Sequence, residues 1–448
     1  MHSPHAATTN TPLTREAMEP FWMPMTPNRQ FKSSPRLFTG AEGMHYTTQD
    51  GRQILDGMAG LWCVNAGHGQ RRIVEAIQTQ AAKLDFVSSF QMSHPAAFEL
   101  AGRITEIAPD GLDHVFFTNS GSESVDTALK IARGYHRARG EASRIRFISR
   151  AKAYHGMGWG GLSVSGLSRH RRDFGPLLPE VDHLPHTHDP EHAAFSRGQP
   201  QWGAHFADEL EKLLLIHDPS TIAAVIVEPV TGSGGVYPPP VGYLERLRKT
   251  CDQHGILLIF DEVITGFGRL GAPFASNALG VTPDLITCAK GMTNAAVPMG
   301  GVITSGKVYQ ALMNGPENTV ELFHGYTYSA HPLACAAGLA ALDVYQDLGL
   351  FDRAYRIAPV WEAAAHALRD APYVTDIRNI GLLAAIDLKP RDGAPGGRGM
   401  ECATRCYDDS ILIRAAGDTL MISPPLIITE DQIEAIFSTI RRALQAIA

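Results

Sequence analysis

The stretches LLIFDEVITGFGRLG (residues 257–271) and PDLITCAKG (residues 283–291) decide the fold class. Each begins as a short apolar run, and Asp261 and Lys290 lie where the two runs end. A short, continuous apolar run is typical of a strand buried on both faces of a parallel sheet. Because ligands bind beyond the carboxyl ends of such strands, we expect Asp261 and Lys290 to face one crevice.

Apolar runs of the same kind recur on both sides of these stretches and alternate with helical periodicity. A helix is predicted over residues 242–255, and the other predicted strands lie at residues 114–117, 146–149, 223–228 and 300–304. This alternation predicts an α/β fold in which a mainly parallel central sheet carries helices on both faces.

The pattern changes near residue 330. Two Ala-rich helices are expected first, and the predicted elements are helices at 330–348 and 351–369, short strands at 374–387, a glycine-rich loop at 391–399, a strand at 411–414 and a last helix from 429. We therefore expect a large domain over residues 61–329 and a smaller α+β domain over residues 330–448. Residues 1–60 are predicted to join the small domain.

The composition argues against several classes of protein. A net charge of −7, from 39 basic and 46 acidic residues, speaks against a nucleic-acid partner. The six cysteines show no paired CxxC motifs, and the first 20 residues carry no targeting pattern, so we expect a cytoplasmic protein. No apolar run reaches the roughly 18 residues that a membrane span needs, so no membrane partner is expected.

The charged strand ends suggest a particular chemistry. A buried carboxylate such as Asp261 needs a cationic partner, and a protonated pyridine nitrogen would be one. Burial of Lys290 would lower the pKa of its amine and make it a nucleophile toward aldehydes. Two alternatives stay open on these grounds: Asp261 could cap the next turn, and the Lys290 ammonium could reach solvent.

A third feature is the turn SGSE at residues 120–123, between a predicted strand and a predicted helix. Free N–H groups at a helix N-terminus, together with the helix dipole, bind phosphate. Ser122 and Glu123 equally suit an ordinary helix cap, so this turn alone does not distinguish the two roles.

Together these motifs resemble the class III aminotransferases, which depend on pyridoxal 5'-phosphate. The resemblance rests on FDEVITGFGRLG and on the D-x5-K spacing from Asp284 to Lys290, and it extends from about residue 55 to MISPPLIIT near residue 421. It implies the aspartate-aminotransferase-like fold (fold type I) and a cofactor held as a Schiff base on Lys290. It also implies a homo-oligomer, a dimer at minimum with a tetramer favoured, whose active sites lie between subunits.

The same resemblance implies a role for each residue that matches the family pattern. Lys290 and Asp261 would be catalytic, with Asp261 paired to the cofactor ring. The other cofactor residues would be the phosphate turn Gly121 and Ser122, the ring-stacking Tyr154 with His155 beside it, Glu228 near the ring hydroxyl, Val263 on the opposite ring face, and Thr327 lent to the phosphate by a neighbouring subunit. Tyr154 and Val263 would serve equally well as core residues.

Two departures from the wider family bear on the substrates, a small-molecule amino donor and a keto acid. Family members that use 2-oxoglutarate resemble one another in an arginine and an acid, whose places are taken here by Met421 and Ser233. Arg414 instead resembles the carboxylate-binding arginine of the omega-amino acid:pyruvate branch, on a flexible loop, with Trp62 as an apolar wall. We expect β-alanine as donor, pyruvate as acceptor, and Lys290 as the base of a ping-pong mechanism.

Several alternatives stay open on sequence grounds. The donor could be taurine, a diamine or an aryl-alkylamine; an aminomutase would need no keto acid; and a non-catalytic phosphate-binding module would need no strand-end lysine. Arg414 could form a surface ion pair, and Trp62 could be a core residue. Two clusters of potential metal ligands are not expected to bind a metal. The histidines of residues 183–192 are expected in a solvated loop, and Cys402 and Cys406 are expected to be packing residues.

Overall fold

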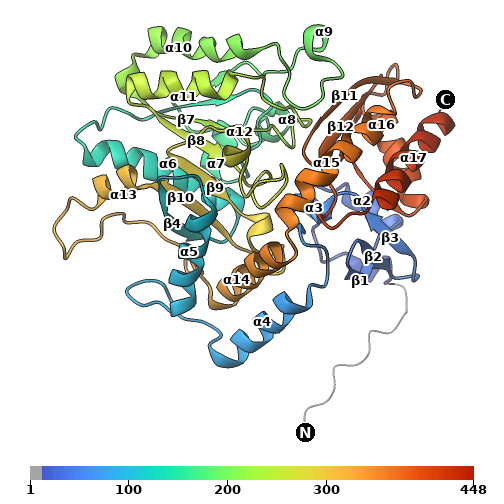
Figure 1. The fold of residues 1–448 in the computed structure, drawn as a ribbon, viewed down its shortest axis with the longest axis horizontal. Coiled ribbons are helices and arrows are strands. Elements are labelled where there is room, and N and C mark those ends of the chain that lie inside the picture. The colour runs from blue at the N-terminus through green and yellow to red at the C-terminus, as the bar shows by residue number, and fades with distance from the viewer. Residues whose placement is uncertain (1–12, 448) are drawn as a thin grey trace.

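A computed structural model describes residues 13–447 of the chain. Residues 1–12, which hold most of the segment expected to carry no targeting pattern, and residue 448 lie outside the described part. Figure 1 shows a central sheet surrounded by helices, with the N-terminal strands beside the C-terminal helices. The helices of seven or more residues are α4 Arg71–Lys83, α5 Pro95–Ile107, α6 Gly121–Ala138, α10 Glu209–His217, α11 Tyr243–His254, α13 Gly306–Leu312, α14 Pro332–Asp347, α15 Leu350–His366, α16 Gly397–Asp408 and α17 Glu430–Ala446.

The central sheet has seven strands in the order β4-β10-β9-β8-β7-β5-β6. Their bounds are β4 Leu112–Thr118, β5 Arg146–Arg150, β6 Val181–Leu184, β7 Ile222–Val227, β8 Leu257–Asp261, β9 Leu285–Cys288 and β10 Gly300–Ser305. β10 is antiparallel to both of its neighbours, and the other pairs are parallel. The prediction of a mainly parallel sheet is confirmed.

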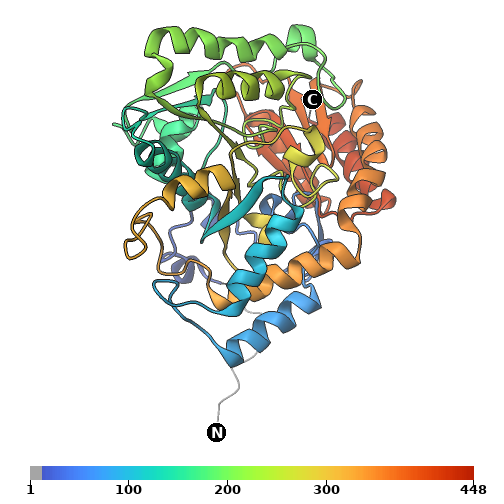
Figure 2. The same cartoon turned by 60° about the vertical axis from the view of Figure 1, so that its left-hand side comes forward.

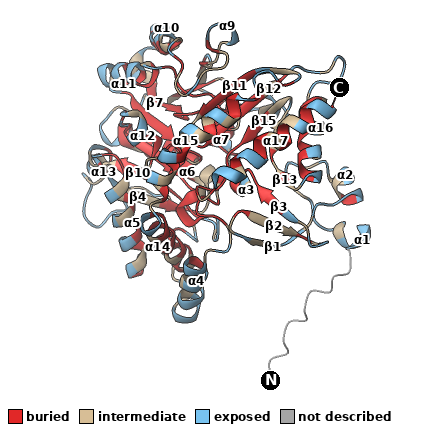
Figure 3. Ribbon diagram, turned by 45° about the vertical axis from the view of Figure 1, so that its right-hand side comes forward, coloured by how far each residue is buried: buried red, intermediate tan, exposed pale blue. Residues whose placement is uncertain are grey.

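Alternate residues of the central strands face two different cores. In β8, Leu257 and Ile259 pack with apolar residues of α6, whereas Leu258 and Phe260 pack with those of α11. Because helices cover both faces, both sets of side chains are buried, as the red strands of Figure 3 show. On the α11 side the core continues to α14, which packs against α4 and α5 (Figure 2).

Two smaller sheets complete the molecule. One has the order β1-β2-β3-β13 and joins the two ends of the chain, with bounds β1 Phe38–Glu42, β2 His45–Thr48, β3 Gln53–Asp56 and β13 Ile411–Leu412. The other has the order β11-β12-β15-β14, with bounds β11 Val374–Ile380, β12 Leu383–Leu388, β14 Arg414–Ala416 and β15 Thr419–Ile422. β3 pairs with β13, a contact that favours placing residues 1–60 with the small domain; the domain boundaries stay a prediction.

The structure corrects three local predictions. The strand predicted at 411–414 is two strands, β13 and β14, which belong to different sheets, and β15 was not predicted. The glycine-rich loop 391–399 ends early because α16 begins at Gly397. The histidine segment is only in part a solvated loop, since it starts within β6, where the His183 Nε2 atom bonds to the carbonyls of Val164 (3.2 Å) and Ser165 (3.0 Å), whereas His192 at its other end is exposed. Cys402 and Cys406 are buried in α16, as packing residues would be.

No single helix of residues 13–447 combines the length and apolar character of a membrane span. Only α14 and α15 taken together reach that threshold, and a bend of 57° separates them.

Candidate active site

Asp261 and Lys290 lie at the carboxyl edge of the central sheet, as their strand-end positions predict. Asp261 is the last residue of β8, and Lys290 begins the 3-10 helix η3 (Lys290–Thr293) just after β9. The pairing of these strands places Thr287 opposite Asp261, and the Thr287 hydroxyl donates to Asp261 Oδ1 at 3.1 Å. Thr287 was not predicted, although aligning the two strand ends would have found it.

The Asp261 carboxylate is buried and held from two sides. Its Oδ2 lies 2.7 Å from His155 Nδ1, and its Oδ1 accepts the Val263 N–H at 3.2 Å. The bond from the Val263 N–H agrees with the alternative that Asp261 caps the turn after its strand. A turn cap has no need of the contact with His155. Three of the predicted residues therefore meet at one carboxylate.

The neighbouring acid, Glu262, points into a different environment. Its carboxylate accepts the Ser276 N–H at 2.9 Å and the Thr265 hydroxyl at 2.9 Å, so it holds the start of the short helix α12 (Ala275–Leu279). Burial raises the pKa of the Glu262 carboxyl. Of the two adjacent acids, only Asp261 faces the candidate site.

The turn predicted to bind phosphate lies at the N-terminus of α6, next to Val263, which is predicted to cover one face of the cofactor ring. Ser120, not Ser122, caps the helix, because its Oγ accepts the Glu123 N–H at 3.2 Å. Ser122 Oγ instead accepts the N–H of Met157 at 3.1 Å. Gly121 packs so closely on Val263 that a Cβ at this position would lie 2.9 Å from Val263 Cγ1.

The Glu228 carboxylate lies next to Tyr154 and accepts hydrogen bonds from two backbone N–H groups. Its Oε1 accepts the Tyr154 N–H at 2.9 Å, and its Oε2 accepts the Gly232 N–H at 2.8 Å. Burial raises the pKa of the Glu228 carboxyl and also that of the Tyr154 phenol. The Tyr154 ring meets the His170 ring edge to face, with 5.5 Å between the ring centres, a contact that was not predicted.

The Trp62 indole lies near two cationic side chains of the candidate site, Lys290 and Arg414. The ring centre of Trp62 is 5.3 Å from Lys290 Nζ and 5.3 Å from Arg414 Cζ, within cation–π range of each. Lys290 keeps some exposed surface, but burial of its amine lowers its pKa to about 8. The position of Nζ beside the Trp62 ring speaks against the alternative in which the ammonium extends freely into solvent.

Arg414 begins the strand β14 and does not lie on a flexible loop, which corrects the sequence expectation. Its partner in the antiparallel ladder is Met421, which is fully buried. The backbone ladder fixes the position of Arg414, so only its side chain is free to swing. Burial lowers the pKa of the guanidinium, and the Tyr154 hydroxyl acts in the opposite direction.

Thr327 stands apart from the other predicted residues. It is exposed on the segment between α13 and α14. Its neighbour Tyr326 turns inward, and the Tyr326 hydroxyl donates to the Glu123 carbonyl in the first turn of α6 at 3.4 Å. An exposed hydroxyl suits service to a neighbouring subunit, and that role stays a prediction.

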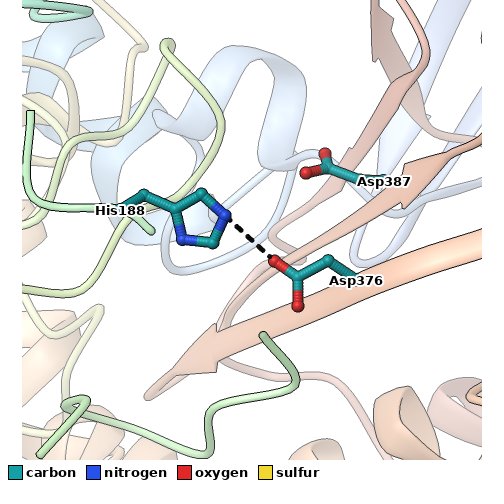
Figure 4. A group of neighbouring side chains, drawn as sticks. All are labelled: His188, Asp376 and Asp387. Atoms are coloured by element: carbon teal, nitrogen blue, oxygen red, sulfur yellow. Dashed lines mark ion pairs between the residues drawn. The ribbon is translucent and has the colours of Figure 1, made fainter. Parts of the chain in front are cut away.

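One group of side chains has the composition of a metal site. His188 faces Asp376 and Asp387 across the junction of the large and small sheets, and its Nε2 lies 3.3 Å from Asp376 Oδ2 (Figure 4). The buried Arg378 guanidinium already bonds to both carboxylates, with Nη1 2.7 Å from Asp387 Oδ2. Burial lowers the pKa of His188 to about 4, so the imidazole is neutral near pH 7. The cation at this place is an arginine, which favours a structural ion-pair network.

Comparison with known proteins identifies the family. The family model described as aminotransferase class-III matches residues 27–444. The chain therefore belongs to the class III aminotransferases, and the prediction of an aminotransferase is confirmed.

Its relatives include an omega-aminotransferase of Caulobacter vibrioides, 58% identical over 95% of this chain and 97% of that protein. A beta-alanine–pyruvate aminotransferase of Pseudomonas aeruginosa is 48% identical over 95% of this chain and 96% of that protein. Among solved structures, an amine transaminase from an uncultivated Pseudomonas species, in its PLP-bound form, has a TM-score of 0.87 and 35% identity, covering 96% and 99% of the two chains. The (S)-enantioselective omega-transaminase of Thermomicrobium roseum has a TM-score of 0.90 and 33% identity, covering 97% and 98%. Fold type I is confirmed.

Proposed function

We propose that this aminotransferase binds pyridoxal 5'-phosphate and moves the amino group of an omega-amino acid, β-alanine in the first place, to pyruvate. The products would be alanine and the semialdehyde of the donor. The observation that carries this proposal is the pairing of Arg414 with a buried Met421 beside Trp62.

The residues at the sheet edge fit the cofactor. Lys290 would bind its aldehyde, Asp261 would pair with its ring nitrogen, and the N-terminus of α6 would hold its phosphate. Gly121 fits a cradle, because its missing Cβ leaves the backbone close to Val263. When bound, the cofactor supplies an electron-poor ring that stabilises negative charge on the carbon bearing the amino group.

The side chains of the chain perform the proton chemistry around this ring. Because burial lowers the pKa of Lys290 to about 8, its Nζ carries and releases a proton near neutral pH. Asp261, held by His155 and Thr287, would present its carboxyl group to the ring nitrogen. Tyr154 and Val263 would flank the ring and exclude water from its faces.

The substrate side favours a monocarboxylate acceptor. Arg414 offers a guanidinium that can form a bidentate pair with the carboxylate of pyruvate or of β-alanine. A dicarboxylate needs a second cation, but the position opposite Arg414 in the ladder holds the apolar Met421. Ser233 offers no charge that would gate an arginine.

A donor panel tests the proposal. Cofactor-loaded enzyme is mixed in single turnover with β-alanine, taurine, putrescine or 1-phenylethylamine, and the loss of the bound cofactor's visible absorption band is followed. We expect β-alanine to discharge the band fastest and pyruvate to restore it. Repeated turnover of a single amine to an isomer with no keto acid present would instead indicate an aminomutase.

A second candidate is an amine:pyruvate aminotransferase. The relatives include a putrescine–pyruvate aminotransferase of Pseudomonas aeruginosa at 36% identity, and the similar solved structures include an amine transaminase. Faster discharge by putrescine or 1-phenylethylamine than by β-alanine would favour this candidate. We also propose a homodimer as the minimal active unit, because the exposure of Thr327 between α13 and α14 suits a hydroxyl that serves a neighbour's phosphate.

A further inference from the structure

The turn that carries Trp62 has an unusual backbone. Ala59 and Trp62 have φ values of 46° and 57°, and Gly60 between them has φ 67°. Only glycine adopts positive φ freely, so the other two residues keep this conformation only where surrounding contacts hold them. The position of the Trp62 ring therefore depends on whatever holds this turn.

Asp56 holds the turn from its beginning. Its fully buried carboxylate accepts the Met58 N–H on Oδ1 at 2.9 Å and the Gly60 N–H on Oδ2 at 2.6 Å. These two bonds fix the residues on either side of Ala59. The Met58 carbonyl then accepts the Trp62 N–H at 2.8 Å, which links the carboxylate to the indole through one residue.

His68 fixes the carboxylate in turn. Its Nε2 lies 2.8 Å from Asp56 Oδ2, and its ring packs against the Tyr46 ring at 4.3 Å. The Asp56 oxygen that accepts the Gly60 N–H is therefore also bound by the imidazole. A buried carboxylate with three donors has a defined orientation.

The same residue also lies beside the strand that leads to Arg414. Asp56 pairs with Leu412 in the parallel ladder between β3 and β13, and the Gly57 N–H donates to the Leu412 carbonyl at 2.9 Å. Arg414 follows two residues later. Asp56 thus connects the turn that presents the Trp62 indole with the strand that precedes the arginine.

We propose that Asp56, oriented by His68, is a positioning residue that sets the Trp62 indole against Lys290 and Arg414 and so determines the width of the substrate site. It touches no substrate itself and acts through Trp62. The inference rests on the proposed function only in taking Trp62 as a wall of the substrate site.

A double-mutant cycle tests this coupling. Asp56→Asn is nearly isosteric, but an amide nitrogen cannot accept the N–H groups that the second oxygen binds. We expect it to raise the KM of the amino donor about tenfold, as loss of one charged hydrogen bond would, with a smaller change in kcat. In a Trp62→Ala background the same substitution should change KM less than twofold, because the wall it positions is gone.

Two further variants separate positioning from folding. His68→Leu removes the donor to Asp56 and should reproduce the KM effect, whereas His68→Gln keeps a donor and should restore part of it. Asp418→Asn is the matched control, since the Asp418 carboxylate accepts the N–H groups of Gly396 (2.6 Å) and Gly399 (3.0 Å) at the start of α16. This control should lower thermal stability and leave the donor KM unchanged.

Equal effects of Asp56→Asn with and without Trp62 would overturn the proposal, as would an unchanged KM in His68→Leu. If Asp56→Asn does not fold, the His68 pair carries the same test in both backgrounds. The cycle is measured with whichever amine turns over fastest. An error in the assignment of β-alanine as donor would therefore change the substrate used and leave the coupling test intact.

Discussion

His155 Nδ1 lies 2.7 Å from Oδ2 of Asp261, and both side chains are buried at the end of β8. The imidazole and the Thr287 hydroxyl bind opposite oxygens of the carboxylate, so its direction is fixed before any ligand arrives. In the described residues the buried His155 Nε2 has no hydrogen-bond partner, so the contact with Asp261 is the one that orients the ring.

Asp261→Asn should lower kcat by about 10²–10⁴-fold, because a neutral amide cannot keep the cofactor nitrogen protonated. His155→Gln keeps a donor toward Asp261 and should cost much less. The measurement is kcat at saturating cofactor, with far-UV circular dichroism to show that both variants fold. A kcat of Asp261→Asn within threefold of wild type would contradict the assigned role.

Lys290→Met should stabilise the cofactor-free enzyme near neutral pH. The Lys290 pKa is about 8 in the folded state against an ordinary 10.5, so the charged amine is disfavoured on folding. That penalty is fully present below pH 8 and fades as the pH rises toward 10.5, where both states are neutral. Urea unfolding should show a gain of about 1–3 kcal/mol near neutral pH that shrinks by about pH 10.

The control for this measurement is Lys249→Met, which replaces an exposed lysine of α11. It should change the free energy of unfolding by less than about 0.5 kcal/mol at either pH. A gain in Lys290→Met that is the same at both pH values would mean that removal of a charge is not its cause.

Arg378→Met should destabilise the fold by about 3–5 kcal/mol, because it leaves the buried Asp376 and the partly buried Asp387 carboxylates without their cation. Arg72→Met is the exposed counterpart; it breaks an ion pair with Asp347 at 2.5 Å and should cost at most about 1 kcal/mol. Chelators and divalent cations should leave the melting temperature of the wild type unchanged. A cation-induced rise that His188→Ala abolishes would instead establish a metal site there.

Thr327→Ala should weaken cofactor binding, and a partner subunit that carries Thr327 should restore it. If Thr327 serves the neighbour's site, a mixed dimer of Thr327→Ala and Lys290→Met subunits contains one complete site. Mixing the two weakly active variants should therefore restore up to half of the activity of one wild-type dimer. Failure to regain activity after verified subunit exchange would show that Thr327 serves its own chain.

Much of this site could be predicted from local sequence. Asp261 and Lys290 stand out because polar residues are rare at the ends of fully apolar strands, and the helix start at Gly121 follows from the turn before it. Thr287 and His170 were missed because their roles depend on which strands and loops become neighbours. Asp56 and His68 were missed for the same reason, because the Asp56 carboxylate reaches its two backbone N–H donors only once the turn has folded.

The small domain was harder to predict than the large one. Arg414 was expected on a flexible loop because of the resemblance to the omega-amino acid:pyruvate branch, and the switch from β13 to β14 between two sheets leaves no local signal. The histidine segment was expected in solvent because of its prolines and its lack of helical spacing, yet the His183 Nε2 atom bonds to the carbonyls of Val164 and Ser165, and His188 Nε2 lies 3.3 Å from Asp376 Oδ2. Long-range pairing, rather than local propensity, decided these cases.

The choice of keto acid as acceptor is tested most directly by following, in single turnover, how fast the enzyme passes its amino group to each candidate. Enzyme first discharged with β-alanine, which then carries the amino group, is mixed with pyruvate or with 2-oxoglutarate, for wild type and for Arg414→Ala. We predict a rapid return of the absorption band with pyruvate, an at least 10²-fold slower return with 2-oxoglutarate, and a roughly 10–100-fold loss of the pyruvate rate constant in Arg414→Ala, as loss of a charged pair would cause. Equal rates of return with both keto acids, or a wild-type pyruvate rate in Arg414→Ala, would contradict the assignment.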